Sequence, residues 1–277
     1  EGQRIVAELG FVPLGDKWGY IDSVGATVID ARFDNALTFS EGLGAVMMGT
    51  AWGYVDSSGA VAIEPQFGSA GPFVDGLALV SGPTGFGYID RTGAAVIPQQ
   101  FELAGDFGSG LAPVVVGGLW GYIDTTGALA LAGQYDWAEP FSEGLAPVQV
   151  GALWRYIDTS ANMVIAPGFE AVSGFHEGLA AVLIGEQWGF IDPAGALVIP
   201  ATFSDGGRFS DGVAAVVIDE GRWQYIGGSG TPEVPGSYDL ADPFVDGIAF
   251  VGVEGVVGYI DRSANWIWGP VPWTAAD

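Results

Sequence analysis

Apolar and polar positions follow a fixed order in residues 109–142, which represent the chain as a whole. A run rich in β-branched residues, 110–116, leads into Gly117-Gly118, an aromatic segment, 120–124, and a third apolar run, 128–132. Short runs of this composition, bounded by glycine-containing turns, are typical of β-strands. The pattern therefore predicts three short strands joined by tight turns.

The middle strand carries an internal alternation. Side chains alternate across a strand, so Trp120 and Tyr122 share one face while Gly121 and Ile123 lie on the other. We expect the two aromatic side chains to be buried in the core. A bare glycine permits close approach, and we expect an aromatic ring from a neighbouring repeat to pack on Gly121.

This aromatic phrase recurs along the whole chain. Its central residue stands at Tyr20, Tyr54, Tyr88, Tyr122, Tyr156, Phe190, Tyr225 and Tyr259. Every step between these positions is 34 residues except one of 35. A fixed period of this length indicates a repeat architecture. We predict a single domain, residues 1–277, of eight tandem three-stranded β repeats, with an atypical first repeat (1–40) and an atypical last repeat (246–277).

A turn signal follows the aromatic phrase. In Asp124-Thr125-Thr126-Gly127 the aspartate suits the start of a β-turn and the glycine suits a position of positive φ. Two repeats have Ala161 or Ala264 in place of the glycine, each followed by an asparagine. Asparagine also tolerates positive φ, so this substitution pattern favours a turn over a ligand site.

The last segment of each repeat has a different spacing. Phe33, Ala36 and Phe39 exemplify it, with aromatic residues six apart and a small residue midway. Spacing of this kind predicts one turn of helix rather than a strand.

Charge and composition exclude several classes of partner. The chain has 33 acidic and 8 basic residues and a formal net charge of −25, which disfavours nucleic acids and anionic membrane surfaces. It has no cysteine, and no apolar run approaches the roughly 18 residues of a membrane span. We interpret the start at Glu1, without a methionine, as that of a mature chain after cleavage of a signal peptide.

The combined pattern resembles a known family. The phrase Trp120-Gly121-Tyr122-Ile123-Asp124, with a glycine three residues later, follows a Gly-Leu-Ala-x-Val segment and precedes the spaced aromatic pair. It resembles the bacterial WG-repeat family, also called WG β-repeat or KWG, over nearly the whole chain. The full Lys-Trp-Gly stands only at Lys17-Trp18-Gly19. The resemblance implies β-rich repeat proteins that are often exported or at the cell surface, and it supplies no catalytic residue.

Two all-β arrangements fit these repeats. The first and third strands are apolar on both faces, which is typical of strands covered on both sides, as in the blades of a β-propeller. We therefore favour a β-propeller-like ring. An open β-solenoid is the alternative, because its first and last repeats would act as atypical caps.

Candidate catalytic and metal-binding residues are few. The single histidine, His176, occupies a slot where other repeats have Ser, Val or Gly, and one histidine without cysteine excludes the usual zinc sets. The densest acidic stretch, Asp205, Asp211, Asp219 and Glu220, is a weak candidate for calcium. Glycine-rich residues 252–258 resemble a nucleotide loop but fall in a predicted β-hairpin. We predict no catalytic residue, no metal and no cofactor.

Tryptophans outside the repeat register form the candidate binding site. Trp266, Trp268 and Trp273 are either a cap over the last repeat or a docking patch for a partner. The in-register aromatic residues are expected in the core, although sugar-binding propellers also present one aromatic residue per blade.

These observations predict a function class. We expect a non-catalytic, exported interaction or structural module, a subunit or accessory of a surface or extracellular assembly, located outside the bacterial cytoplasm as a secreted, periplasmic or cell-surface protein. Its partner is expected to be a protein. The alternative is a carbohydrate-binding, lectin-like repeat protein. We expect no enzymatic activity.

Overall fold

A computed structural model describes residues 10–14, 17–218 and 221–272. These residues form strands and turns and no helix, so none of them belongs to a helix with the length and apolar composition needed to span a membrane. Contacts group the chain into two compact units, Glu1–Gly144 (unit 1) and Leu145–Asp277 (unit 2). The single domain over residues 1–277 stays a prediction.

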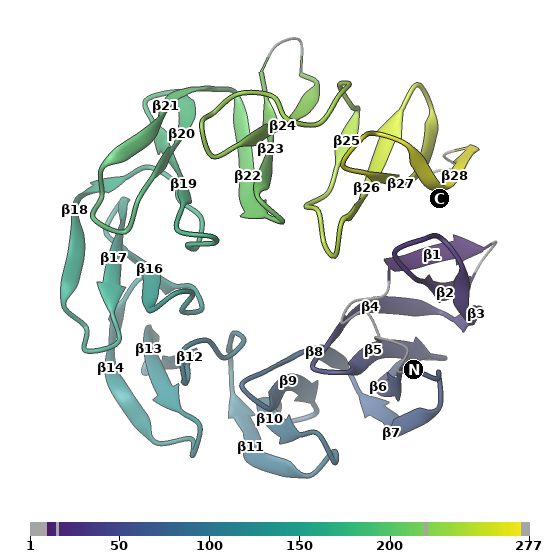
Figure 1. The fold of residues 1–277 in the computed structure, drawn as a ribbon. Coiled ribbons are helices and arrows are strands. Elements are labelled where there is room, and N and C mark those ends of the chain that lie inside the picture. The colour runs from purple at the N-terminus through teal and green to yellow at the C-terminus, as the bar shows by residue number, and fades with distance from the viewer. Residues whose placement is uncertain (1–9, 15–16, 219–220, 273–277) are drawn as a thin grey trace, which may run out of the picture. The chain divides into compact units, whose positions relative to one another are not determined.

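Unit 1 contains four antiparallel sheets (Figure 1). Their strands, sheet by sheet, are β1 (Gly10–Leu14), β2 (Lys17–Ile21) and β3 (Thr27–Phe33); β4 (Asn35–Ser40), β5 (Leu43–Met48), β6 (Ala51–Asp56) and β7 (Val61–Phe67); β8 (Ser69–Val74), β9 (Leu77–Gly82), β10 (Gly85–Asp90) and β11 (Ala95–Phe101); β12 (Leu111–Val116), β13 (Leu119–Asp124) and β14 (Leu129–Tyr135). The short strand β15 (Trp137–Ala138) follows.

Unit 2 repeats the same antiparallel pattern. Its strands are β16 (Leu145–Val150), β17 (Leu153–Asp158) and β18 (Met163–Phe169); β19 (Ala180–Ile184), β20 (Gln187–Ile191) and β21 (Leu197–Phe203); β22 (Asp205–Ser210), β23 (Val213–Val217) and β24 (Trp223–Gly227); β25 (Leu240–Ala241), β26 (Ile248–Val253), β27 (Val256–Asp261) and β28 (Trp266–Pro272). Eight small sheets thus correspond to the eight predicted repeats.

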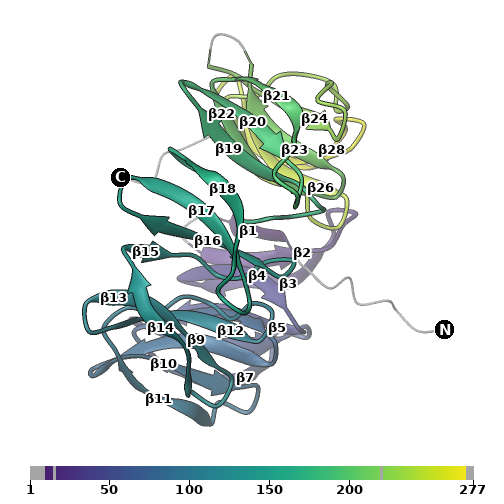
Figure 2. The same cartoon turned by 90° about the vertical axis from the view of Figure 1, so that its left-hand side faces the viewer.

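The hydrophobic core lies between consecutive sheets. In unit 1, Tyr88 and Ile97 of the third sheet pack with Val114 and Ile123 of the fourth. Figure 2 shows these two sheets side by side. In unit 2, Tyr156 of the fifth sheet belongs to one cluster with residues of the sixth. Strands that are apolar on both faces are explained by this arrangement, because both faces of an inner sheet are covered.

The predicted helical turn is wrong. Residues 35–40 form β4, which pairs with β5 and adds a fourth strand to the sheet. A register shift between Ala36 and Phe39 marks a β-bulge, and the extra residue puts these two side chains on the same buried face. The spacing of three therefore reflects a bulged strand. In the fourth sheet the same segment forms only two bridges, Ala104 to Val114 and Gly108 to Leu111.

The predicted aromatic core is confirmed. The Tyr122 ring is fully buried, packs 4.8 Å from the Phe141 ring and donates its hydroxyl to the Glu139 carbonyl at 2.8 Å. Trp120 is also buried. The same tyrosine-to-carbonyl bond, always 17 residues apart, joins Tyr20 to Leu37, Tyr54 to Gly71, Tyr88 to Gly105, Tyr156 to Ser173 and Tyr225 to Asp242.

The expectation that an aromatic ring from a neighbouring repeat packs on Gly121 is wrong. A Cβ at Gly121 would lie 2.5 Å from the Leu131 carbonyl oxygen and 2.8 Å from the Gly133 nitrogen. Both atoms belong to β14, the outer strand of the same sheet, which is bulged opposite this point. In the fourth sheet, bulged backbone crosses the face of Gly121 and leaves no room for a Cβ.

The predicted Asp-x-x-Gly turn is confirmed. The Asp124 carboxylate accepts the backbone N–H groups of Thr126 at 2.9 Å and Ala128 at 3.1 Å, and Gly127 has a φ of +84°. Ala161 takes the positive φ itself, at 63°. Asn162, which we expected to accommodate that backbone, instead donates its side-chain amide to Asp158 at 2.9 Å.

This turn is also a packing contact, and it yields a prediction. A Cβ at Gly127 would lie 3.2 Å from Cγ2 of Ile97 in the preceding sheet, whereas Gly117, also with positive φ, has open space. Gly127→Ala should therefore reduce the free energy of unfolding by about 2 kcal/mol, and Gly117→Ala by only about 1 kcal/mol. Urea unfolding measures both. Equal losses would show that Ile97 imposes no constraint on the turn.

Candidate interaction surfaces

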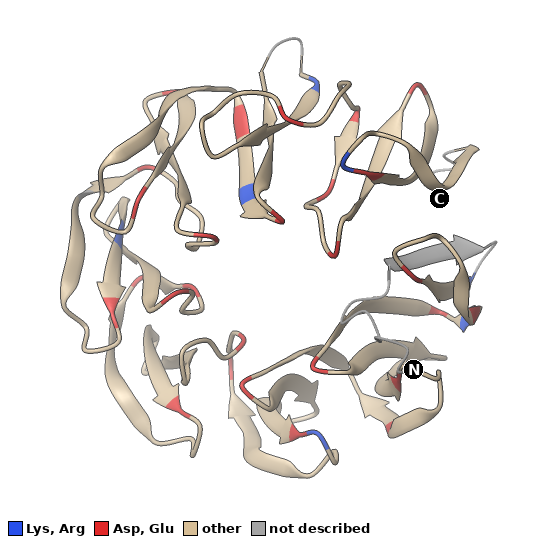
Figure 3. Cartoon of the chain, in the orientation of Figure 1, with Lys and Arg blue, Asp and Glu red and all other residues tan. Residues whose placement is uncertain are grey.

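Hairpin tips of one geometry recur along the described chain, and six of the seven in this series carry an acidic residue. At each tip a non-glycine residue with a φ between 50° and 54° precedes a glycine that also has positive φ, which is the geometry of a type I′ turn. Figure 3 shows acidic residues at many of these tips. The residues in the first turn position are Glu41, Asp75, Ser109, Glu143, Glu177, Asp211 and Asp246.

Several tip carboxylates bind the next tip in the same unit. The Gly110 N–H donates to Asp75 at 2.9 Å in unit 1, and the Gly212 N–H donates to Glu177 at 2.8 Å in unit 2. An acid at this position therefore satisfies a backbone donor of the next hairpin, which gives it a structural role.

The sequence-predicted candidates for chemistry are dispersed. His176 lies in a hairpin, where its backbone exchanges hydrogen bonds with Leu179. Asp205 is the first residue of β22 and Asp211 follows its last residue, so the two are separated by the length of the strand, and Asp219 and Glu220 fall outside the described residues. Within residues 10–14, 17–218 and 221–272, no group of three or more His, Cys, Asp or Glu residues could hold a metal ion. Glycine-rich residues 252–258 form the predicted hairpin between β26 and β27.

The structure places two of the three candidate docking tryptophans on one strand. Trp266 and Trp268 belong to β28. Trp266 is 36% exposed. Its ring lies over Gly258, because a Cβ added to that glycine would be only 2.9 Å from the ring. Trp268 packs edge-on against Tyr259, with 6.4 Å between ring centroids. Trp273 lies outside the described residues. The described rings cover their own sheet, and the docking role stays a prediction.

Asp106 is a partly buried acid that sequence reasoning missed. Three other repeats have proline at this position (Pro72, Pro140 and Pro243) and three have Thr38, Gly174 or Arg208, so the position varies and its residue type did not mark Asp106 as unusual. Its carboxylate lies 2.9 Å from where a Cβ at Gly71 would be. Burial raises the pKa of the Asp106 carboxyl to about 6.

A pH-dependent prediction follows from Asp106. Because its pKa is raised in the fold, the ionised form is destabilising above about pH 6, and the penalty is relieved as the pH falls toward 4. Asp106→Asn should therefore stabilise the protein by about 2 kcal/mol at pH 7.5, and this gain should shrink toward zero at pH 4. Thermal unfolding across this range measures it, with exposed Glu102→Gln as the control. A gain that does not vary with pH would contradict burial of a charged carboxylate.

Exposed apolar side chains recur near the start of one edge strand in six of the eight sheets. We call these edge strands, β3, β7, β11, β14, β18 and β21, the outer strands. The exposed fractions of these side chains lie between 41% and 51%, and they occur in both units. They are Val28, Val61, Val96, Leu129, Met163, Val164, Leu197 and Val198. The outer strands also contain register shifts, and several carry proline, both of which hinder pairing of the edge with another strand.

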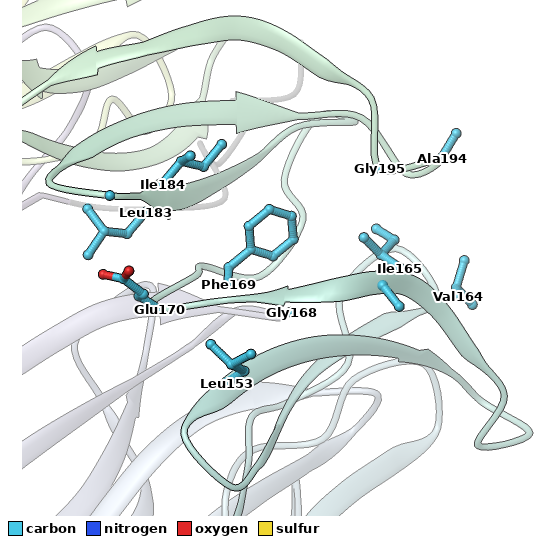
Figure 4. Close-up of a pocket in the computed structure, with 12 residues that line it drawn as sticks. Leu153, Val164, Ile165, Gly168, Phe169, Glu170, Leu183, Ile184, Ala194 and Gly195 are labelled. Carbon is cyan, nitrogen blue, oxygen red and sulfur yellow. The ribbon is translucent and has the colours of Figure 1, made fainter.

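A groove lies between the fifth and sixth sheets of unit 2 (Figure 4). It encloses about 450 Å³ between β18 and the hairpin that joins β19 to β20. Leu153, Phe169 and Leu183 project into it, the Glu170 carboxylate lies near one end, and the turn at Ala194 lies at the other.

An equivalent groove occurs in unit 1, between the third and fourth sheets. It encloses about 430 Å³ and is lined by Phe101, Val115, Val116 and Leu129, among others. Phe101 and Val116 precede Phe169 and Ile184 of the unit 2 groove by 68 residues, which is two periods of the repeat. The groove is therefore a product of the repeat itself.

Small antiparallel sheets packed in chain order within each unit define an all-β repeat protein of the β-propeller class. The sequence model of the protein family described as 'WG containing repeat' matches this chain at residues 18–49, 52–81, 86–120, 120–154, 154–188 and 188–223. The chain belongs to the WG-repeat family. The predicted family and fold class are both confirmed.

Similar solved structures support the fold alone. Hsv2p of Kluyveromyces lactis aligns with a TM-score of 0.55 and 10% identity, covering 80% of this chain and 89% of that chain. A eukaryotic initiation factor aligns with a TM-score of 0.52 and 15% identity, covering 82% and 72%. Comparison with curated proteins gives no match.

Proposed function

We propose that the chain is an exported, non-catalytic interaction module, a subunit or accessory of a surface or extracellular assembly with a protein partner. The observation that carries the proposal is the recurrence of exposed apolar side chains in the outer strands. Exposed apolar positions that repeat along a surface suit a macromolecular partner better than a small molecule. The exported location rests on what the WG-repeat resemblance implies.

The proposal is tested on the protein isolated from its source. Native mass spectrometry of the intact complex should detect a protein partner in fixed stoichiometry, and surface labelling of intact cells should reach the chain. Leu129→Asp and Leu197→Asp should reduce partner recovery at an unchanged melting temperature, because both side chains are exposed. Isolation of the chain alone from the cytoplasm would overturn the proposal.

A lectin is the second candidate, favoured by one observation. The tryptophans of the repeated aromatic phrase at Trp52, Trp154 and Trp188 are half-buried, so each residue keeps some contact with solvent. An exposed aromatic face can stack on a sugar ring. Binding of purified protein to a glycan array, lost on Trp188→Ala and retained on Val198→Ala, would favour the lectin over the protein-binding module.

A further inference from the structure

We propose that the unit 2 groove binds an extended, basic segment of a protein partner, with an apolar side chain inserted beside Phe169 and a Lys or Arg side chain placed at Glu170. This inference rests on the proposed function, because it names the partner class and the site for the same interaction module.

The shape and lining of the groove select the apolar part of the ligand. Leu153, Phe169 and Leu183 give it an apolar interior, and its volume of about 450 Å³ lies within the range of specific ligand sites. Ile184 lines the same groove with 43% of its side chain exposed. Covering these side chains removes apolar surface from water, which favours a leucine- or phenylalanine-like group.

Charge selects the other part of the ligand. Glu170 lines the groove, and it is not the partner in the ion pairs of Lys17, Arg222 or Arg262. The chain as a whole has a net charge of −25, so an acidic partner would be repelled and a basic one attracted. An amphipathic, basic segment therefore satisfies both features of the groove.

Its recurrence argues for a partner with more than one such segment. The unit 1 groove has Phe101 and Val116 at the positions of Phe169 and Ile184, but its lining contains no acidic residue. It should therefore accept the same apolar group with less dependence on charge. Linked segments would gain avidity from two equivalent grooves.

Synthetic peptides provide the test. The probe is a fluorescein-labelled hexapeptide of alternating leucine and lysine, and the reference peptides replace either leucine by serine or lysine by glutamate. Fluorescence anisotropy against the full chain should show the leucine–lysine peptide binding at least tenfold more tightly than either reference. Affinity should fall as the salt concentration rises, because part of it is electrostatic.

Matched variants locate the binding site. The double variant Ile184→Arg with Val116→Arg should weaken binding at least tenfold. The control, Val24→Arg with Val150→Arg, adds the same charge at exposed positions outside both grooves and outside the recurring outer-strand set, and it should have no more than a small effect. Glu170→Gln should weaken binding about two- to fivefold, the size expected for one surface ion pair, and exposed Glu186→Gln should not.

Any of three peptide-binding results would overturn the groove proposal. They are equal binding of the leucine and serine peptides, equal loss in the two arginine double variants, and equal effects of Glu170→Gln and Glu186→Gln. If the Ile184→Arg, Val116→Arg protein still recovers its partner in full, the groove proposal fails while the interaction module stands. Absence of any partner for the wild-type protein removes the proposed function without changing the peptide result.

Discussion

Replacing Tyr122 by alanine is expected to destabilise the protein by about 4 kcal/mol, because it leaves a cavity in a fully buried site and removes a hydrogen bond. The ring contacts Phe141, and the hydroxyl satisfies the Glu139 carbonyl. Chemical denaturation followed by tryptophan fluorescence measures the loss.

The chain supplies its own control for Tyr122. Phe190 occupies the equivalent position in the sixth repeat, where it packs 5.1 Å from Phe209 without a hydroxyl. Tyr122→Phe should therefore fold and lose only about 1 kcal/mol, the effect of one unmade buried hydrogen bond. A Tyr122→Ala variant as stable as Tyr122→Phe would mean that the ring does not fill the core.

Gly121→Ala is expected to cost about 3 kcal/mol although alanine is the smallest possible addition. The new methyl group would meet backbone atoms of Leu131 and Gly133 at 2.5 and 2.8 Å, and backbone in a paired strand cannot rotate away as a side chain can. We expect a lower denaturation midpoint and faster amide hydrogen exchange in β14.

Gly228→Ala is the control for Gly121→Ala. Gly228 is exposed, with no atom within 4 Å of an added Cβ, so its replacement should leave stability unchanged or raise it slightly. The fifth repeat has Arg155 in place of the glycine, beside Gly168 of its own outer strand. If Gly121→Ala proves neutral without a compensating change in β14, the bulged backbone is not the reason for the glycine.

Sequence periodicity predicted the repeats, their three strands, the turns and the aromatic core, because each depends on residues close together in the chain. Tyr122 is identified by alternation, and Gly127 by the chemistry of its turn. The outer-strand bulge opposite Gly121 was missed because a bulge changes pairing register without a distinct composition. For the same reason, the spacing of residues 35–40 was interpreted as a helical turn although these residues form a bulged strand.

Candidate sites were harder to predict than the fold. The groove beside Phe169 forms where two successive repeats meet, so neither repeat shows it alone. Asp106 occupies a position that varies among the repeats, and its partial burial depends on the neighbouring sheet. Trp266 was singled out because it lies outside the repeat register, but composition does not indicate that its ring lies over Gly258.

The hydrogen bond from each tyrosine to a carbonyl 17 residues onward has a consequence for synthesis and folding. The Tyr88 hydroxyl donates to the Gly105 carbonyl, and the Gly110 N–H donates to the Asp75 carboxylate, which lies only 35 residues earlier in the chain. Contacts of such short sequence separation are formed quickly, and each needs only its own or an adjacent repeat. A chain that emerges unfolded from a ribosome or a translocation channel can thus fold from its N-terminus before its end appears. With no cysteine to oxidise, this order of folding needs no disulfide-forming enzyme.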